Sequence, residues 1–385
     1  MQRNSSLGLK NVKVLVTGSN GFIGKNLIAK LNEFKNITIK QFVRGNDPKD
    51  LFRLIAETDI VFHLAGENRP DDDDAFFRGN IELTETICES VTSVYNSFGR
   101  YVPLVFTSSI HAKNNTPYGQ SKLTAENLIK HMCENTGNPG VIFRLPGVFG
   151  KWCKPNYNSV VATFCHNIAN NIPISISESD RTLELVYIDD VISAFMDLCQ
   201  TGFAGFSFAT VDTVYSISLG ELANRIQAFS ESRSNLISER VGTGLTRALY
   251  STYVSYLPAK KFAYHLPHYS DERGMFVEMM KTQDSGQFSY FTAHPGVTRG
   301  GHYHHSKTEK FLVVKGEALF CFRDLLTNEL IELRTSCDVP KVVETIPGWA
   351  HEITNVGEDE MIVMLWANEN FDPEKPDTVA CKVLK

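Results

Sequence analysis

The periodicity of apolar residues changes partway along the chain, and this change constrains the fold more than any other feature. Before about residue 250, short β-branched runs such as VKVLVTG alternate with longer amphipathic segments such as GKNLIAKLNEF. Alternation at this spacing is typical of a parallel, doubly wound α/β sheet. After about residue 259, short runs such as EKFLVVKG and MIVMLWA follow one another across Gly, Asp-Glu and Asn turns. This second pattern predicts an all-β jelly-roll barrel.

The length and composition agree with two folded domains. The chain has 385 residues, of which 42% are apolar and 21% charged, and this balance is sufficient for two buried cores. We expect the α/β domain over residues 1–255, a linker over 256–268 and the barrel over 269–385.

Charge and cysteine usage exclude several classes of protein. A formal net charge of −6 gives no general basic field, so nucleic acid is not an expected partner. The eight cysteines form no C-x-x-C pair, and MQRNSSLGLK lacks the apolar core of a secretion signal. No uncharged apolar run reaches the length of a spanning helix, so we predict a cytoplasmic protein with reduced thiols.

The segment TGSNGFIG predicts a dinucleotide-binding turn of the Rossmann type. Its glycines at 18, 21 and 24 follow an apolar strand and precede an amphipathic helix, where a Cβ would block the turn and the pyrophosphate. The expected cofactor contacts are Gly18, Asn20, Gly21, Phe22, Ile23, Gly24, Leu64, Ala65 and Lys122.

Arg44 is the residue from which we predict NADPH rather than NADH. It lies in FVRGND, about where an NAD-binding unit places an acidic residue on the ribose 2′-hydroxyl. A guanidinium at that place suits a 2′-phosphate. The alternative is that Arg44 is a solvated loop residue, with Asp47 close enough in sequence to compete for the ribose.

The segment TPYGQSK places Tyr118 and Lys122 four residues apart, on one face of a predicted helix. An ammonium group beside a phenol favours the phenolate, so we expect Lys122 to lower the pKa of Tyr118 and make it a usable proton donor. Ser109 ends the strand PLVFTSS, and the carboxyl ends of parallel strands face the cofactor crevice.

Together with HLAG, Asn80 and LVYIDDV, these motifs resemble the extended short-chain dehydrogenase/reductases that act on nucleotide sugars. The resemblance covers roughly the first 250 residues. It implies that Ser109 polarises a substrate carbonyl, that Tyr118 protonates it, and that Lys122 tunes the tyrosine and holds the nicotinamide ribose. The chain departs from this family in one respect, because only eight residues separate Ser109 from Tyr118.

In the second half, GGHYHHSKTEK and GWAHEITN match the two cupin motifs. Alternate residues of a strand share a face, so His302 and His304 point into the barrel, where Glu309 and His351 complete three nitrogen ligands and one oxygen ligand. This set suits Zn²⁺, although it also accepts Fe, Mn or Ni. The alternative is an empty barrel whose histidines bond one another.

The segment YSDERGMFVEMMK resembles the Asp-x-Arg-Gly stretch of the deoxysugar 3,5-epimerases, which are cupins. The resemblance implies that Arg273 approaches a substrate phosphate, whereas the simpler interpretation is a polar turn. The sequence does not identify the epimerase base. Tyr290, His294, His305 and Lys307 all lie near the motif.

A reductase of this kind joined to a cupin resembles, over nearly the whole chain, the bifunctional CapF-type enzymes of capsule and O-antigen synthesis. The resemblance implies that the cupin epimerises C3 of a UDP-2-acetamido-2,6-dideoxy-4-hexulose. The reductase would then use NADPH at C4 to give UDP-N-acetyl-L-talosamine, the precursor of UDP-N-acetyl-L-fucosamine. It also implies a homodimer joined largely through the cupins. Two alternatives are a reductase with a structural, dimerising cupin and a non-enzymatic NADPH-sensing regulator.

Overall fold

The computed structural model describes residues 11–69 and 74–384 and divides into two compact units. The first comprises residues up to Ile226 together with Arg247–Leu257, and the second comprises Gln227–Thr246 and Pro258–Lys385. The short segment 227–246 therefore packs with the C-terminal unit, whereas the sequence analysis assigned it to the first domain. No helix in the described ranges is both long and apolar enough to cross a membrane.

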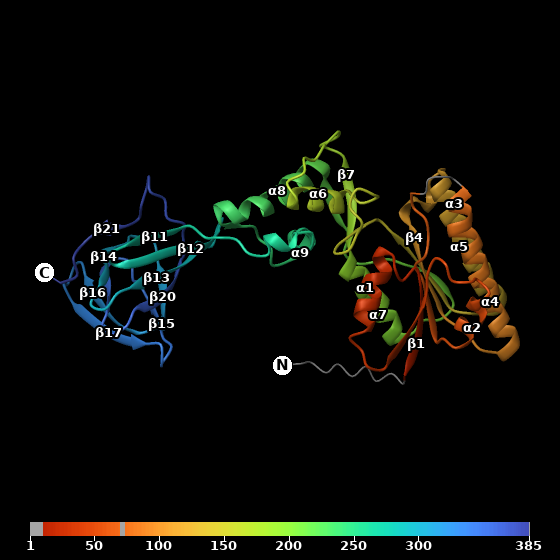
Figure 1. The fold of residues 1–385 in the computed structure, drawn as a ribbon, viewed down its shortest axis with the longest axis horizontal. Coiled ribbons are helices and arrows are strands. Elements are labelled where there is room, and N and C mark those ends of the chain that lie inside the picture. The colour runs from red at the N-terminus through yellow and green to blue at the C-terminus, as the bar shows by residue number, and fades with distance from the viewer. Residues whose placement is uncertain (1–10, 70–73, 385) are drawn as a thin grey trace. The chain divides into compact units, whose positions relative to one another are not determined.

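A parallel sheet with the strand order β2-β1-β3-β4-β5-β8 forms the centre of the first unit (Figure 1). Its strands are β1 (Val12–Thr17), β2 (Ile37–Phe42), β3 (Ile60–His63), β4 (Leu104–Ser109), β5 (Gly140–Leu145) and β8 (Phe206–Ala209). Helix α1 packs with α7 on one face of this sheet, and α4 packs with α2 and α5 on the other face. These helices are α1 (Phe22–Leu31), α2 (Asp50–Ala56), α4 (Leu83–Phe98), α5 (Pro117–Thr136) and α7 (Ile188–Thr201). The predicted doubly wound α/β fold is confirmed.

Further elements complete this unit. A second sheet has the order β6-β7-β9. The remaining elements are α3 (Asp74–Phe76), the π-helix η1 (Phe77–Glu82), the 3-10 turn η2 (Ile110–Lys113), β6 (Gly147–Phe149), α6 (Val160–Ala169), β7 (Thr182–Tyr187), β9 (Tyr215–Ser218), α8 (Leu219–Asn235) and α9 (Gly244–Ser255). Helix α8 passes from the first unit into the second.

Strand β4 and helix α5 position the chemistry of the first unit. Every residue of β4 is buried, as expected for a central strand of a parallel sheet. Helix α5 begins after Thr116, whose side chain accepts a hydrogen bond from the backbone N of Gly119 at 3.1 Å, and Pro117 occupies its first turn. It ends at Gly137, which adopts the left-handed conformation. These signals hold one face of α5 against the carboxyl end of β4.

The second unit is an antiparallel barrel made of two sheets. One sheet has the order β10-β12-β13-β20-β15-β18, with β11 added beside β12, and the other has the order β17-β16-β19-β14-β21. The strands are β10 (Ile237–Ser238), β11 (His268–Asp271), β12 (Gly274–Thr282), β13 (Gln287–Ala293), β14 (Thr298–Tyr303), β15 (Glu309–Lys315), β16 (Glu317–Asp324), β17 (Leu330–Ser336), β18 (Val342–Glu344), β19 (Trp349–Asn355), β20 (Met361–Ala367) and β21 (Val379–Ala380), and the 3-10 turn η3 (Ala259–Lys261) precedes them.

The two sheets enclose one apolar core, to which β13, β15, β16, β19 and β20 contribute alternate residues. Antiparallel pairing of β14 with β19 places His302 opposite His351. The predicted all-β barrel is confirmed, and its strand register explains how histidines far apart in the sequence come together.

Candidate active sites

The glycine turn after β1 is packed too tightly for side chains at two of its positions. Gly18 has φ of +68°, and a Cβ there would lie 2.6 Å from the backbone N of Ala65. A Cβ on Gly24 would lie 2.3 Å from the carbonyl oxygen of Gly18. Gly21 immediately precedes α1, so the free N–H groups of the first helical turn face the place where a pyrophosphate would bind.

A buried histidine beneath this turn joins three elements. His63 at the end of β3 lies 2.8 Å from Thr17 Oγ1 through Nδ1 and 2.9 Å from Thr84 Oγ1 through Nε2. Because Thr84 donates its hydroxyl proton to the carbonyl of Asn80, Nε2–H must be the donor to Thr84, and Nδ1 accepts from Thr17. Burial, helped by the charge of Lys122, lowers the pKa of His63 to about 3, so the ring is neutral. Sequence reasoning noted the HLAG motif without this role.

The structure brings together the three predicted catalytic side chains. Ser109 is the last residue of β4; its hydroxyl accepts a hydrogen bond from the backbone N of His111 and lies close enough to Tyr118 to oppose the rise of the pKa of the phenol. Lys122, one turn further along α5, donates from Nζ to the carbonyl oxygen of Thr107 at 3.2 Å. The spacing of four residues places the phenol and the ammonium on the same face of the helix, as predicted.

Burial controls the protonation of Tyr118 and Lys122. Burial raises the pKa of Tyr118, and the interaction with the Ser109 hydroxyl opposes this shift without reversing it. It also lowers the pKa of Lys122 to about 8, against the negative charge of Glu126, which raises it. The expectation that the pKa of Tyr118 is lowered is not met in this structure, because burial is the dominant effect and raises that pKa.

Glu126, which the sequence analysis did not identify, lies one helical turn beyond Lys122. Its carboxylate is 2% exposed and accepts hydrogen bonds from Arg144, with Nε at 2.9 Å and Nη2 at 2.5 Å, and from the hydroxyl of Ser108 at 2.5 Å. A fully paired buried carboxylate at this place supplies the negative charge that keeps Lys122 protonated. The spacing Tyr118-x₃-Lys122-x₃-Glu126 was the signal available in the sequence.

Asn80 holds the loop after β3 against Lys122. Its side chain accepts from the backbone N of Glu67 at 2.8 Å, and donates to Glu67 O and to Ser121 Oγ, both at 2.9 Å. A Cβ on Gly66 would lie 2.7 Å from the amide oxygen of Asn80 and 2.9 Å from Lys122 Nζ. The close approach of this loop therefore requires a glycine.

Arg44 lies after the end of β2, with 89% of its side chain exposed, and forms an ion pair with Glu67. The guanidinium is therefore on the surface beside the loop that follows β3. It is engaged by a carboxylate that the sequence analysis did not consider. Asp47, the predicted competitor, instead accepts a hydrogen bond from the backbone N of Lys49.

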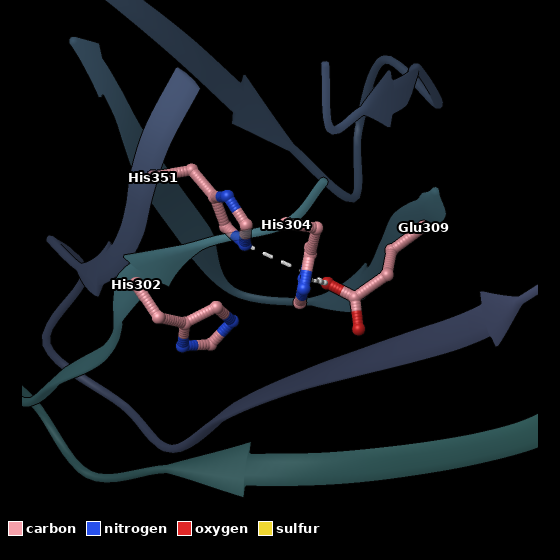
Figure 2. Close-up of side chains that lie close together, drawn as sticks. All are labelled: His302, His304, Glu309 and His351. Carbon is pink, nitrogen blue, oxygen red and sulfur yellow. Dashed lines mark hydrogen bonds and ion pairs between the residues drawn. The ribbon is translucent and has the colours of Figure 1, made fainter. Parts of the chain in front are cut away.

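The four predicted metal ligands converge inside the barrel (Figure 2). One donor atom from each of His302, His304, Glu309 and His351 lies within 4.8 Å of the others. Glu309 Oε2 is 3.3 Å from His304 Nε2 and 3.6 Å from His351 Nε2. Donors bonded to a tetrahedral Zn²⁺ lie about 3.4 Å apart, so this part of the cluster already has suitable spacing.

The electrostatics of the cluster also fit a cation. Burial lowers the pKa of His302 to about 4, so its imidazole is neutral. Burial alone would raise the pKa of Glu309, but the adjacent side chains of His304 and His351 and the charge of Lys307 outweigh this effect and hold the pKa well below the usual range. Nε2 of His351 is buried without a hydrogen-bond partner, as expected for an atom that would ligate a metal.

The cluster opens onto a cavity of about 280 Å³. His302, Glu309 and His351 line it together with Lys307, one of the four candidates for an epimerase base. Its apolar wall is formed by Phe276, Phe291, Phe311, Phe320, Ile353 and Leu365. A pocket that combines an apolar wall with a few convergent polar groups suits a small polar ligand.

Two arginines near this cavity differ from the sequence interpretation. Arg273 does not line it: this exposed side chain donates to the carboxylate of Asp271, with Nε at 2.9 Å. Arg299, which the sequence analysis missed, does line it, and its Nη2 is buried without a partner, while Nε donates to Thr292 O at 3.0 Å. Arg299 therefore forms part of the cavity wall, and one of its guanidinium nitrogens has hydrogen-bonding capacity that the described residues do not use.

Comparison with known proteins identifies the family. Residues 14–210 match the NAD dependent epimerase/dehydratase family, and residues 269–379 match the polysaccharide biosynthesis C-terminal domain. The chain belongs to the NAD dependent epimerase/dehydratase family. The first match covers the glycine turn and the trio of Ser109, Tyr118 and Lys122, and the second covers the four clustered donors of the barrel.

Relatives with both domains show that the full arrangement is shared. A UDP-2-acetamido-2,6-beta-L-arabino-hexul-4-ose reductase from Pseudomonas aeruginosa is 55% identical over 372 residues, covering 97% of this chain and 99% of the relative. The crystal structure of the capsular polysaccharide assembling protein CapF from Staphylococcus aureus is 38% identical, with a TM-score of 0.88 over 96% of this chain and 99% of the other. The predicted membership of the CapF type is confirmed.

A further relative matches only part of this chain. The dTDP-4-dehydro-6-deoxyglucose reductase of Escherichia coli is 24% identical over 254 residues, covering 54% of this chain and 77% of the relative. The reductase trio and the cluster of donors lie in regions that match different family models, so each site has its own functional assignment.

Proposed function

We propose that the chain is a bifunctional nucleotide-sugar enzyme of capsule or O-antigen synthesis. Its barrel epimerises C3 of a UDP-2-acetamido-2,6-dideoxy-4-hexulose, and its α/β domain reduces the C4 ketone with NADPH. The product is UDP-N-acetyl-L-talosamine, the precursor of UDP-N-acetyl-L-fucosamine. The grouping of Ser109, Tyr118 and Lys122 at the carboxyl end of β4 carries the reductase assignment. The relative from Pseudomonas aeruginosa is named as a reductase of such a sugar.

The ketone explains why one chain carries both sites. A carbonyl at C4 makes the C3 proton acidic, so a base in the barrel removes it to give an enolate, which is reprotonated on the opposite face. Lys307 and Arg299 both line the cavity, so both are placed to contact the sugar. Reduction at C4 removes the acidity of C3, so epimerisation comes first.

In the reductive step each member of the trio has one role. A bound nicotinamide cofactor would supply a hydride to C4. Ser109 orients the carbonyl oxygen by a hydrogen bond, and Tyr118 donates its phenolic proton to that oxygen as the alcohol forms. Burial, which raises the pKa of Tyr118, keeps the phenol protonated before the step. Lys122 places a positive charge beside the phenolate that results and stabilises it.

The family supports a nicotinamide cofactor, and we propose that this cofactor is NADPH. The exposed guanidinium of Arg44 lies beside the loop that follows β3 and can exchange Glu67 for a 2′-phosphate. A phosphate offers a bidentate partner with more charge than a carboxylate. The glycine turn and α1 provide the pyrophosphate site.

For the barrel we propose Zn²⁺ held by His302, His304, Glu309 and His351. Four protein donors are typical of a closed structural site, whereas a catalytic zinc site keeps one position open. This observation favours a second candidate function, in which the α/β domain alone is active and the barrel only stabilises the protein. The cavity beside the cluster favours the bifunctional assignment.

We further propose a cytoplasmic homodimer that associates through the barrels. All eight cysteines are free thiols, as expected in a reducing compartment. Strand β17 lies at the edge of its sheet and exposes Leu330, Ile331 and Leu333. Exposed apolar edges of this kind are usually covered by a partner. Sedimentation should give twice the chain mass, and charged substitutions on β17 should give a monomer.

The experiment that tests the function is incubation with a UDP-4-keto-6-deoxy amino sugar in D₂O, with and without NADPH. The bifunctional assignment requires deuterium at C3 without NADPH and oxidation of NADPH in the complete mixture. Reduction without any exchange at C3 would support the reductase with a structural barrel. Exchange and reduction both absent would refute the assignment to this substrate class.

A further inference from the structure

Asp377, in the C-terminal segment, fixes the loop between two of the strands that carry metal donors. Its carboxylate accepts hydrogen bonds from the backbone N–H groups of His305, Ser306 and Lys307 at 2.9, 2.7 and 2.8 Å. It also accepts from the hydroxyl of Ser306 at 2.9 Å. A carboxylate that accepts this many donors is held rigidly and in its charged form. The loop joins β14, which presents His302, to β15, which begins at Glu309.

The backbone of the same residue orients one of the donors directly. The carbonyl oxygen of Asp377 lies 2.5 Å from Nδ1 of His304, whose side chain is 1% exposed. A carbonyl only accepts, so Nδ1 carries the proton, and a neutral ring then presents the lone pair of Nε2. This Nε2 is the atom that lies 3.3 Å from Glu309 Oε2 inside the cluster. Residue 377 therefore selects the tautomer that can bind a metal.

The residues that follow Asp377 continue along the strand that carries His302. In β21, Val379 pairs with Tyr303 and Ala380 pairs with His302. The backbone N of Cys381 donates to the carbonyl oxygen of Gly301 at 2.8 Å. The C-terminal segment thus forms the outer edge of the sheet beside the donors, and its docking and the donor geometry depend on each other.

We propose that Asp377 is a positioning residue of the metal site, and that docking of the segment 377–381 and binding of the metal stabilise each other. The inference rests on the proposed metal site. Outer partners that fix a ligating histidine typically change metal affinity by about 10- to 100-fold when they are removed. Because the coupling is between two equilibria, metal binding must tighten the docked segment by the same factor by which docking tightens the metal.

The test compares full-length wild-type protein with Asp377→Ala and Asp377→Asn, using Zn²⁺ in chelator competition and Co²⁺ as a spectroscopic probe. We expect Asp377→Ala to bind Zn²⁺ about 10- to 100-fold more weakly and to change the ligand-field absorption of bound Co²⁺, because His304 loses its orientation. Asp377→Asn keeps one acceptor oxygen and should lose less affinity for Zn²⁺. Asp372→Ala is the matched control, because that exposed carboxylate of the same segment accepts only from Glu374 N in the described structure.

Backbone hydrogen exchange of wild-type protein tests the same coupling if Asp377→Ala does not fold. In wild-type protein, adding Zn²⁺ should slow backbone hydrogen exchange in residues 378–381, beyond the change in exposed turns elsewhere in the barrel. Exchange there that is indifferent to Zn²⁺ would overturn the coupling, as would a folded Asp377→Ala protein with wild-type affinity and Co²⁺ spectrum. A wild-type protein that binds neither ion would overturn the metal site itself, and the inference with it.

Discussion

The two candidate sites of this chain differ in whether their buried ionisable groups are shifted toward the neutral or the charged form. In the α/β unit, burial raises the pKa of Tyr118 and lowers that of Lys122 to about 8, so both groups are moved toward their neutral forms. In the barrel, burial also opposes the charge of Glu309, yet its pKa is lowered, because two histidines and Lys307 surround the carboxylate. Burial alone favours neutral groups, and only specific partners preserve a charge.

This difference indicates what each site can do. A phenol that stays protonated until the reaction is suited to give up one proton, which a ketone reductase requires. A carboxylate held ionised among three imidazole rings is suited to bind a cation.

Tyr118→Phe should separate the two chemistries. It removes the proton donor of the reductive step and leaves the barrel untouched, so NADPH oxidation should fall by about 10²- to 10⁴-fold while deuterium still enters C3. Single-turnover NADPH absorbance and mass spectrometry of the sugar measure the two steps. The control is Tyr157→Phe, in the same unit, whose hydroxyl donates to the carbonyl of Arg69. Reduction at a near wild-type rate in Tyr118→Phe would show that another group supplies the proton.

His351→Ala should affect stability first. It removes one of four donors, so the barrel should lose its metal, and a metal bound only to the folded state adds its binding free energy to stability. At a free metal concentration a thousand times the dissociation constant, metal binding stabilises the folded protein by about 4 kcal/mol. This corresponds to a shift in melting temperature on the order of 10 °C. The matched control is His294→Ala, an exposed histidine of the same barrel.

The same variant separates a structural metal from a catalytic one. At temperatures where His351→Ala stays folded, deuterium exchange at C3 of the sugar should fall less than it would if the metal acted as a Lewis acid. Complete loss of exchange in folded, metal-free wild-type protein, with recovery on adding Zn²⁺, would contradict the structural role and assign the metal to stabilisation of the enolate.

The sequence sufficed for the parts of each site that depend on local spacing. The interval of four residues between Tyr118 and Lys122 fixes their common helix face, and the alternation from His302 to His304 fixes a common strand face. The fold class followed from the change in periodicity. The glycine positions followed from the backbone geometry that a tight turn requires.

The parts that were missed depend on contacts between distant segments. Asp377 meets the loop of His304 only through the barrel pairing of β21 with β14. Arg299 was not identified from the sequence, where it is one of many charged residues. Its position in the cavity wall and its unpaired nitrogen follow only from the three-dimensional structure. The pKa of Tyr118 was predicted in the wrong direction, because a sequence shows a neighbouring charge more readily than the depth of burial.

Arg44→Ala should weaken NADPH about tenfold, equivalent to about 1.4 kcal/mol, and NADH less than threefold, since only the former carries the 2′-phosphate. The side chain is 89% exposed, so the difference should shrink as salt is added. KM values for both cofactors at two ionic strengths provide the measurement. Glu67→Gln is the counterpart, because it releases Arg44 and should leave NADPH binding equal or tighter. An equal loss for both cofactors would make Arg44 a structural residue.

Glu126→Gln should have the smallest effect, a shift in the pH dependence of the reduction rate. Lys122 must carry its charge to stabilise the phenolate of Tyr118, and with a pKa of about 8 it loses the proton as pH rises, so wild-type reduction should decline above that pH. Glu126 raises this pKa, so neutralising its carboxylate should move the decline to lower pH and cost a few-fold, at most about tenfold, at pH 8. The rate near pH 6.5 should stay close to that of wild type, because the ammonium is still protonated there. Glu134→Gln, an exposed residue of the same helix, controls for the change in net charge. A uniform loss at every pH would instead mean that Glu126 serves only to anchor Arg144 and Ser108.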